Sequence, residues 1–162
     1  MENETKMKIS GVGPVYVLSI CALTLLSILL SRLSFCRFGV IFKIKIIVQI
    51  IGVIIALSGI YIWIQAVVIS KITKNIKENV LVTSGIYAWV RNPIYSAFTF
   101  IFSGIILVNA NYIFFICPFL FWVIFTLMVK KEEVILQKIF GVQYMEYKAK
   151  VNRCIPWFPK QK

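Results

Sequence analysis

The sequence predicts an all-α integral membrane protein with about four transmembrane helices, and three observations lead to this prediction. First, 60% of the 162 residues are hydrophobic, against about 45–50% in ordinary soluble domains, and the mean hydropathy is +0.87. Second, three stretches of 23, 25 and 38 residues carry no charge, while a membrane-spanning helix needs only about 20 apolar residues. Third, the basic residues are concentrated between and beyond these stretches, as expected at membrane surfaces.

The first two uncharged stretches, residues 9–31 and 46–70, are each predicted to form one span. A secretory signal peptide is the alternative for the first. Its apolar run is longer than the roughly 7–15 residues of such a signal, and no small-x-small cleavage site follows it. In the second span, Gly52 and Gly59 would allow close packing against another helix. Residues 1–70 are therefore expected to supply two anchoring spans.

The third uncharged stretch, residues 92–129, is too long for one span and suits two. Asn109-Ala110-Asn111 lies in its middle, and asparagine favours turns and helix caps. We therefore expect a tight helical hairpin over about 93–108 and 112–129, with Pro118 as a candidate kink in its second helix.

Charged residues return at Lys130, and from residue 132 to 150 they alternate with apolar ones. This pattern predicts a C-terminal amphipathic helix at the membrane interface, broken near Gly141. The proline-rich end, residues 154–159, is expected to pack back against the bilayer surface. The whole chain, residues 1–162, is read as one domain in which residues 71–162 contain a loop, the hairpin and the tail.

Four spans place the N-terminus, the loop at residues 71–92 and the tail on one side of the membrane. That side carries fourteen of the eighteen Lys and Arg residues, and the opposite side carries four, all between residues 32 and 45. The excess predicts that both termini face the cytoplasm. Because these basic residues border uncharged spans, we expect membrane lipids as their partners and no nucleic acid.

Several chemistries are excluded by composition, because the chain has no histidine and no aspartate. A Ser-His-Asp triad, a histidine-based zinc site and a paired-aspartate mechanism all need one or both of these residues. The four cysteines show no CxxC spacing and are expected to be free thiols rather than disulfides. No metal site is predicted.

Residues 81–95 form a polar segment between two apolar blocks and are the best candidate for a site. Gly85 permits a turn that other residues resist. Pro93 forces the residue before it out of helical geometry and can open the next helix, whose first N–H groups then face an anion. Arg91 offers a planar fork for a carboxylate or phosphate.

This loop and the start of the tail fall on the same side of the membrane, because a two-helix hairpin separates them. The loop side chains Tyr87, Arg91, Asn92 and Tyr95 are therefore expected to meet Glu132 and Glu133 at one membrane face. Each residue also has a structural interpretation. The aromatic residues can simply anchor the protein at the membrane interface, and Arg91 can be one of the basic residues that mark the cytoplasmic side. The two glutamates can belong to a solvent-exposed helix start.

The order of these motifs resembles a known family. Leu-Val-Thr-Ser-Gly-Ile-Tyr-Ala-Trp-Val-Arg-Asn-Pro-Ile-Tyr at residues 81–95 is followed by the hydrophobic hairpin, then by Glu-Glu-x6-Phe-Gly-x2-Tyr-x2-Tyr and a final Pro. This arrangement resembles the isoprenylcysteine carboxyl methyltransferase family and, more broadly, the membrane methyltransferases that include phospholipid N-methyltransferases. The similarity covers residues 80–159, about half of the chain.

The resemblance implies S-adenosyl-L-methionine as cofactor and a lipid-like or prenylated acceptor that enters from the bilayer, with the active site on the cytoplasmic face. We expect the acceptor to enter between the hairpin and the second helix. The catalytic candidates are Arg91, as a positioning cation, and Glu133, as its support. The implied cofactor-binding residues are Leu81, Val82, Tyr87, Asn92, Pro93, Ile94, Tyr95 and Glu132.

Two positions depart from the family pattern. The family usually has Arg-His-Pro where this chain has Asn92, and its eukaryotic carboxyl methyltransferases carry an arginine where this chain has Met128. A carboxylate acceptor would need no general base, so O-methylation suits a chain without histidine or aspartate. The alternatives are a phospholipid N-methyltransferase, an NADPH-dependent membrane reductase and a non-catalytic membrane binding protein.

Overall fold

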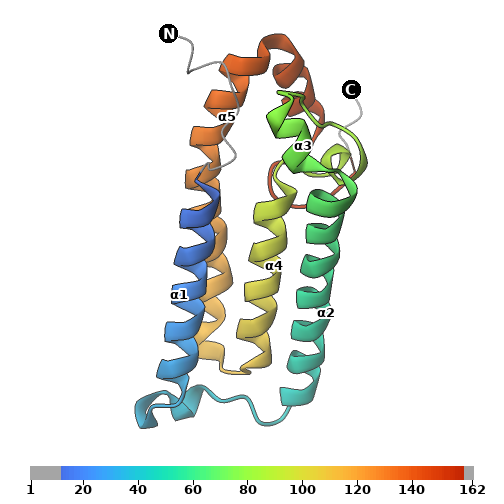
Figure 1. Ribbon diagram of the computed structural model, residues 1–162. Helices are drawn as coiled ribbons and strands as arrows, with labels where there is room; N and C mark the ends of the chain where they lie inside the picture. The colour runs from blue at the N-terminus through green and yellow to red at the C-terminus, as the bar shows by residue number, and fades with distance from the viewer. Residues whose placement is uncertain (1–11, 159–162) are drawn as a thin grey trace.

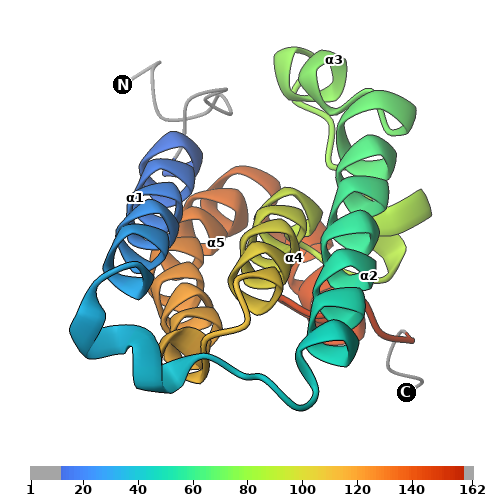
Figure 2. The ribbon, with the colours of Figure 1, turned by 90° about the horizontal axis from the view of Figure 1, so that it is seen from below.

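The computed structural model describes residues 12–158, and four long helices run side by side through this part of the chain (Figure 1). They are α1 (Gly13–Ser31), α2 (Lys45–Ile64), α4 (Pro93–Val108) and α5 (Ile116–Lys150). Helix α4 packs against each of the other three, so it is the central helix of the bundle. The end view shows α4 between α2 on one side and α1 with α5 on the other (Figure 2).

Three of the helical segments are long and apolar enough to cross a membrane, namely Gly13–Ser31, Lys45–Ile69 and Tyr112–Lys150. The second includes the π-helical turn Gln65–Ile69, and the third includes the 3₁₀ turn Tyr112–Phe115. Helix α4 is apolar but has only 16 residues, about 24 Å at 1.5 Å per residue. The expected all-helical membrane architecture is confirmed, with α4 as the short central member.

Helix α2 packs closely on α4 through glycines, as the positions of Gly52 and Gly59 predicted. A Cβ atom at Gly59 would lie 2.7 Å from the carbonyl oxygen of Ala97, and one at Gly52 would lie 2.8 Å from that of Gly104. Both distances are too short for a side chain. The expectation that an acceptor enters between the second helix and the hairpin is therefore wrong at this contact, because the backbones already touch.

The turn between α4 and α5 is at Asn109–Asn111, as predicted. Ala110 has a positive φ of 52°, and the Asn111 side chain accepts a hydrogen bond from the Ile113 N–H at 3.1 Å. The expected kink at Pro118 is wrong. Pro118 is the third residue of α5, where a backbone N–H would have no helical partner to lose.

Helix α5 does not end at residue 129 but continues without interruption to Phe140, so the first part of the amphipathic segment extends the hairpin helix, and a second helical part follows Gly141 up to Lys150. No helix breaker lies between Val129 and Phe140, and lysine and glutamate favour helix. The predicted break at Gly141 is confirmed, with φ 52° and ψ −123°. This break turns the last part of α5 and the tail back toward the loop (Figure 1).

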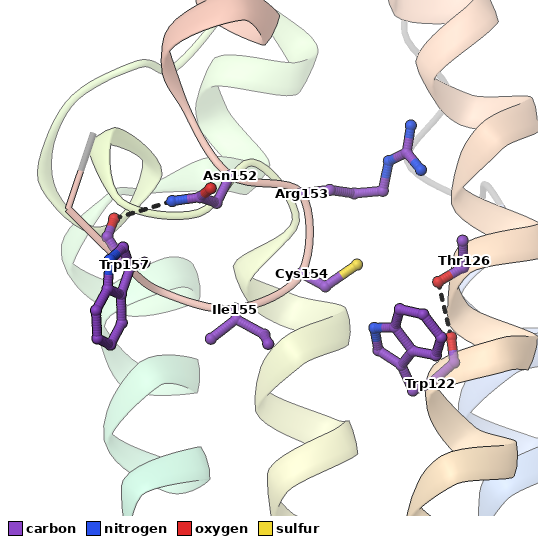
Figure 3. A pocket seen from close by; sticks show the side chains of 7 residues that line it. All are labelled: Trp122, Thr126, Asn152, Arg153, Cys154, Ile155 and Trp157. Atoms are coloured by element: carbon purple, nitrogen blue, oxygen red, sulfur yellow. Dashed lines mark hydrogen bonds between the residues drawn. The ribbon is translucent and has the colours of Figure 1, made fainter. Parts of the chain in front are cut away.

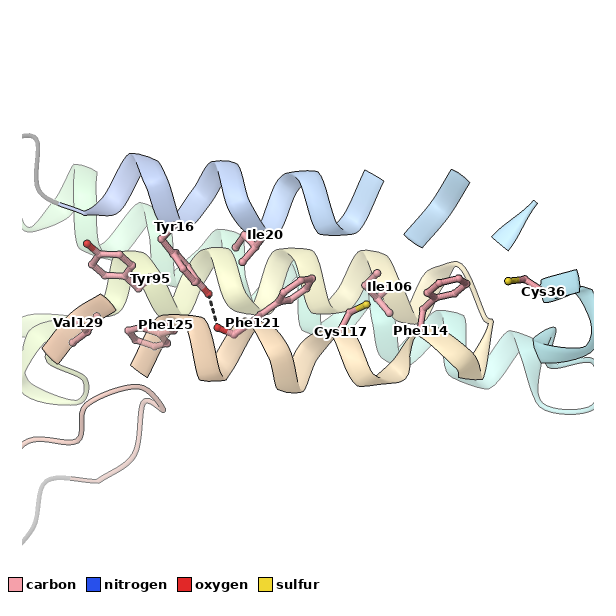
Figure 4. Close-up of a cluster of buried hydrophobic side chains, with 10 residues drawn as sticks. All are labelled: Tyr16, Ile20, Cys36, Tyr95, Ile106, Phe114, Cys117, Phe121, Phe125 and Val129. Atoms are coloured by element: carbon pink, nitrogen blue, oxygen red, sulfur yellow. Dashed lines mark hydrogen bonds between the residues drawn. The ribbon is translucent and has the colours of Figure 1, made fainter. Parts of the chain in front are cut away.

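The main hydrophobic core lies between α1, α4 and α5 (Figure 4). Tyr16, Ile20, Phe121 and Phe125 are buried in it, and the rings of Tyr95 and Phe125 stack with centroids 5.5 Å apart. The start of α1, the loop before α4 and the tail lie at one end of the bundle, while the turn at Asn109–Asn111 lies at the other (Figure 1). The core thus fixes α1, α4 and α5 where the candidate site is built.

Candidate functional site

The loop before α4 adopts the local structure that its glycine and proline predicted. Gly85 has a φ of +60° and begins the 3₁₀ turn Gly85–Ala88. Asn92 has φ −123° and ψ 59°, outside the helical region, and Pro93 is the first residue of α4. Gly85 and Pro93 thus set the path of the loop into α4. Along this path the side chains of Arg91 and Asn92 hydrogen-bond to backbone carbonyls of Lys148 and Arg153.

Glu132 points toward α1 and α4. Its Oε1 accepts hydrogen bonds from the Tyr95 hydroxyl at 2.7 Å and from the Val12 backbone N–H at 2.9 Å. Its Oε2 accepts no hydrogen bond from residues 12–158, and the side chain is half-buried. As far as residues 12–158 are concerned, the carboxylate is held in place through one oxygen and keeps the other available.

Glu133 points to a different side of α5, because consecutive helical residues are about 100° apart. It is buried, with 2% of the residue exposed. It pairs with Arg91 at 2.8 Å, with Arg153 at 3.0 Å and with Lys148 at 3.5 Å. One carboxylate thus faces three cations, which leaves this cluster with two excess positive charges.

Arg91 and its neighbours hold the tail against the loop and α4. The Arg91 guanidinium donates to the carbonyls of Lys148, at 2.9 Å, and Val151, while its backbone N–H donates to Asn152 O at 2.8 Å. The Asn92 amide donates to Arg153 O at 3.2 Å.

Two further hydroxyl groups fasten the same segments. The Ser96 hydroxyl donates to Cys154 O, and the Tyr147 hydroxyl donates to Tyr87 O at 2.7 Å. Burial raises the pKa of the Tyr87 phenol, so this side chain stays neutral. Hydrogen bonding to Glu133 raises the pKa of Arg153 above its usual value.

The remaining predicted residues lie at the same end of the bundle. Leu81 packs against the buried cluster of Tyr144, Tyr147 and Val151. Val82 and Ile94 are half-buried, and Pro93 is buried at the start of α4. The structure therefore brings the loop together with both glutamates, but it divides them into a Tyr95–Glu132 pair and an Arg91–Glu133 cluster.

An open cavity of about 530 Å³, a cleft rather than an enclosed void, lies between α5 and the tail, next to this cluster (Figure 3). This volume lies within the range of about 300–1,000 Å³ that small-molecule sites occupy. None of the predicted site residues lines it, although Arg91, Asn92 and Ser96 hold the tail that forms one wall. Its walls are Trp122, Thr126, Asn152, Arg153, Cys154, Ile155 and Trp157.

Sequence reasoning missed these lining residues, and only part of the set carried a signal. Thr126 lies two helical turns before Glu133 and Trp122 one turn further back, so all three share one side of α5. That spacing could have identified the α5 wall. The tail wall depends on the chain reversal after Gly141, which spacing alone does not predict.

The fold and the site together define a small helical membrane protein with a charged site and an adjoining cavity at one end of its bundle. Residues 46–143 match the model of the phospholipid methyltransferase family, so the chain belongs to this family of membrane methyltransferases. The match covers 98 of 162 residues, including the loop, the hairpin and both glutamates. No curated protein and no solved structure matches the chain.

The expected kinship with membrane methyltransferases is thereby confirmed. The matched region ends at residue 143. It includes Trp122 and Thr126 on the α5 wall of the cavity, but not the tail wall at residues 152–157. The structure therefore shows a contribution of the tail to the site that the family match does not cover.

Proposed function

We propose that this protein transfers a methyl group from S-adenosyl-L-methionine to a lipid-like acceptor in the membrane, at the cytoplasmic face. The family match over residues 46–143 carries this proposal. The arrangement of the helices supports the stated face. The loop, the tail and the start of α1 share one end of the bundle (Figure 1). Fourteen of the eighteen Lys and Arg residues lie, by sequence position, before α1, in the loop at residues 71–92 or from residue 130 onward, and an excess of basic residues is typical of the cytoplasmic side.

The Tyr95–Glu132 pair fits such a cofactor. Glu132 keeps Oε2 available among the described residues, and a fixed carboxylate oxygen can accept hydrogen bonds from ribose hydroxyls or lie beside an ammonium group. The remaining proposed cofactor contacts are Leu81, Val82, Tyr87, Asn92, Pro93 and Ile94. When bound, the cofactor would supply an activated methyl group on a sulfonium, whose transfer depends on proximity and in-line orientation.

Arg91 and Glu133 are proposed to act as positioning residues. Their buried ion pair joins the loop to α5, and Arg91 also binds two tail carbonyls. This arrangement would hold the cofactor-binding loop and the cavity in a fixed relation. The enzyme would thus gain orientation rather than acid–base chemistry from these two side chains.

A carboxylate is the acceptor that these residues suit best, because it needs no general base. The thiol of Cys154 lies on the cavity wall, and burial raises its pKa, which makes it a poor base at neutral pH. A phospholipid amine is the second candidate, and the description of the matched family favours it. A prenylated molecule is one form of the carboxylate acceptor. A membrane reductase or a non-catalytic protein has less support, because the matched family is one of methyltransferases.

The proposal is tested by calorimetric titration of S-adenosyl-L-methionine into the purified protein in dodecyl maltoside. We expect binding, and we expect Glu132→Gln to weaken it by about tenfold, the value of one hydrogen bond to a charged group. Tyr87→Ala should also weaken it. Glu78→Gln is the matched control, because Glu78 is an exposed carboxylate that forms an ion pair with Lys74 on the surface.

Folded wild-type protein that does not bind at millimolar cofactor would remove the proposal. Binding that Glu132→Gln leaves unchanged would remove the assigned site and keep the cofactor. Transfer of a labelled methyl group into a membrane lipid extract would then identify the acceptor and the atom that is methylated.

A further inference from the structure

Among the described residues that line the cavity between α5 and the tail, Arg153 is the only basic one. Its Nε and Nη2 donate to the two oxygens of Glu133, at 3.1 and 3.0 Å. Its Nη1 makes no hydrogen bond to residues 12–158, and 31% of the side chain is exposed. Figure 3 shows the side chain reaching from the tail toward α5, beside Cys154 and Thr126. The guanidinium is therefore fixed by Glu133 and has donors left for a ligand.

The charge around this guanidinium is not balanced. Glu133 supplies one negative charge, while Arg91, Lys148 and Arg153 supply three positive ones. Within residues 12–158 no carboxylate lines the cavity, and Glu132 is turned toward α1 and α4. An anion beside Nη1 would gain a charge-assisted hydrogen bond, and a cation would be repelled.

The other walls are mainly apolar. Trp122, Ile155 and Trp157 contribute aromatic and aliphatic surface, and Cys154 contributes a thiol whose pKa burial raises. Trp122 lies on a helix that is apolar enough to cross the membrane, and 45% of the Trp122 surface is exposed. A ligand that matches these walls and the guanidinium has an apolar part and an anionic head group.

We propose that this cavity binds the anionic head group, a carboxylate or a phosphate, of a membrane amphiphile, and that Arg153 is the residue that selects it. The proposal rests on the proposed function only in naming this amphiphile as the methyl acceptor. Arg153 lies outside the part of the chain that the family match covers, so the selection is a property of this chain's tail. Glu133 orients the guanidinium, and the Asn92 amide fixes the Arg153 carbonyl.

The cavity carries its own reporter, because the Cys154 thiol points into it (Figure 3). The purified protein in dodecyl maltoside is labelled with N-ethylmaleimide at pH 8.5, and the labelled peptide is quantified by mass spectrometry. The probes are oleate, oleoyl lysophosphatidate and oleyl alcohol, which share one chain and differ in head group. Cys21, a half-exposed thiol on α1, is the internal control.

We expect oleate or lysophosphatidate to slow labelling of Cys154 at concentrations at least tenfold below those at which oleyl alcohol does, with Cys21 unaffected. Which of the two anionic probes is stronger distinguishes a carboxylate from a phosphate head group. Arg153→Gln should remove this preference, a loss of about tenfold, and Arg153→Lys should keep most of it. Lys150→Gln removes one charge from an exposed residue of the same segment and should keep it fully.

Equal protection by oleyl alcohol and the anionic probes would overturn the proposal, and so would a preference that survives Arg153→Gln. Protection of Cys154 by S-adenosyl-L-methionine, lost in Arg153→Gln, would also overturn it, because the cavity would then hold the cofactor. Anion selectivity in a protein that does not bind S-adenosyl-L-methionine would support the site and remove only the proposed function.

Discussion

Glu133 is the residue whose loss should reveal how the site is held together. Glu133→Gln keeps the shape of the side chain and removes its charge. Arg91, whose side chain is 7% exposed, then loses its only carboxylate partner among the described residues. Removing one partner of a buried ion pair costs about 3–5 kcal/mol.

The lower end of that range applies here. Of the three ion pairs that Glu133 makes, the one with Arg91 is the only one in which both side chains are buried. The side chains of Arg153 and Lys148 are 31% and 34% exposed, and water screens their share. Arg91 also keeps its hydrogen bonds to the carbonyls of Lys148 and Val151. We therefore expect about 3 kcal/mol, which for a chain of this length lowers the melting temperature by about 6–12 °C.

The assay is thermal unfolding in dodecyl maltoside, followed by tryptophan fluorescence, together with limited trypsin digestion of the folded protein. In the variant, cleavage after Lys150 and Arg153 should become faster, because the tail is no longer held by the cluster. Glu132→Gln is the matched control on the next residue. Both hydrogen bonds to Glu132 use Oε1, and a glutamine oxygen can still accept them.

Glu132→Gln should therefore melt within about 2 °C of the wild type, which corresponds to less than about 1 kcal/mol. Equal melting temperatures and equal tail cleavage in the two variants would refute the reasoning. The cluster around Glu133 would then not be what fastens the tail to the loop.

Two further outcomes follow from the packing. Burial raises the pKa of the Cys154 thiol. Its rate of reaction with N-ethylmaleimide should therefore be below that of a free cysteine at pH 7, and it should still rise with pH where the rate of the free thiol has levelled off. A rate equal to that of free cysteine at every pH would contradict this. Gly59→Val should destabilise the protein by about 1–3 kcal/mol, measured by thermal unfolding, because its Cβ would lie 2.7 Å from Ala97 O; Ser58→Val on the exposed side of α2 is the control, and an equal effect of both would show that α2 and α4 can separate freely.

Much of the fold was predictable from uncharged lengths and turn residues. The stretch at residues 46–70 became Lys45–Ile69, and Asn109–Asn111 became the hairpin turn. These features depend on local chemistry, since a span needs a certain apolar length and asparagine tolerates turn geometry. The end of α5 was not predictable in this way. A change from apolar to charged residues at Lys130 alters the surroundings of a helix without ending it.

The candidate site was predictable in part. Membrane topology placed the loop beside the start of the tail, and the structure joins Arg91 to Glu133 and Tyr95 to Glu132. The cavity was not predictable, because its tail wall depends on the positive φ of Gly141 and on hydrogen bonds from Asn92 and Ser96 to tail carbonyls. Backbone carbonyls carry no sequence signature, so contacts of this kind are found only in a structure.

The two adjacent glutamates explain why one short motif can serve two parts of a site. A rotation of about 100° separates them, so a single helix presents Glu132 to α1 and α4 and Glu133 to the loop and tail. Among the described residues, the first keeps an oxygen without a partner, while the second pairs with three cations. This division suits the proposed function, because the group proposed to bind the cofactor has to stay accessible and the group proposed to fix the geometry has to be buried. Arg153 meets both requirements of the proposal, since Glu133 fixes one edge of its guanidinium and, among residues 12–158, the other edge has no partner at the cavity.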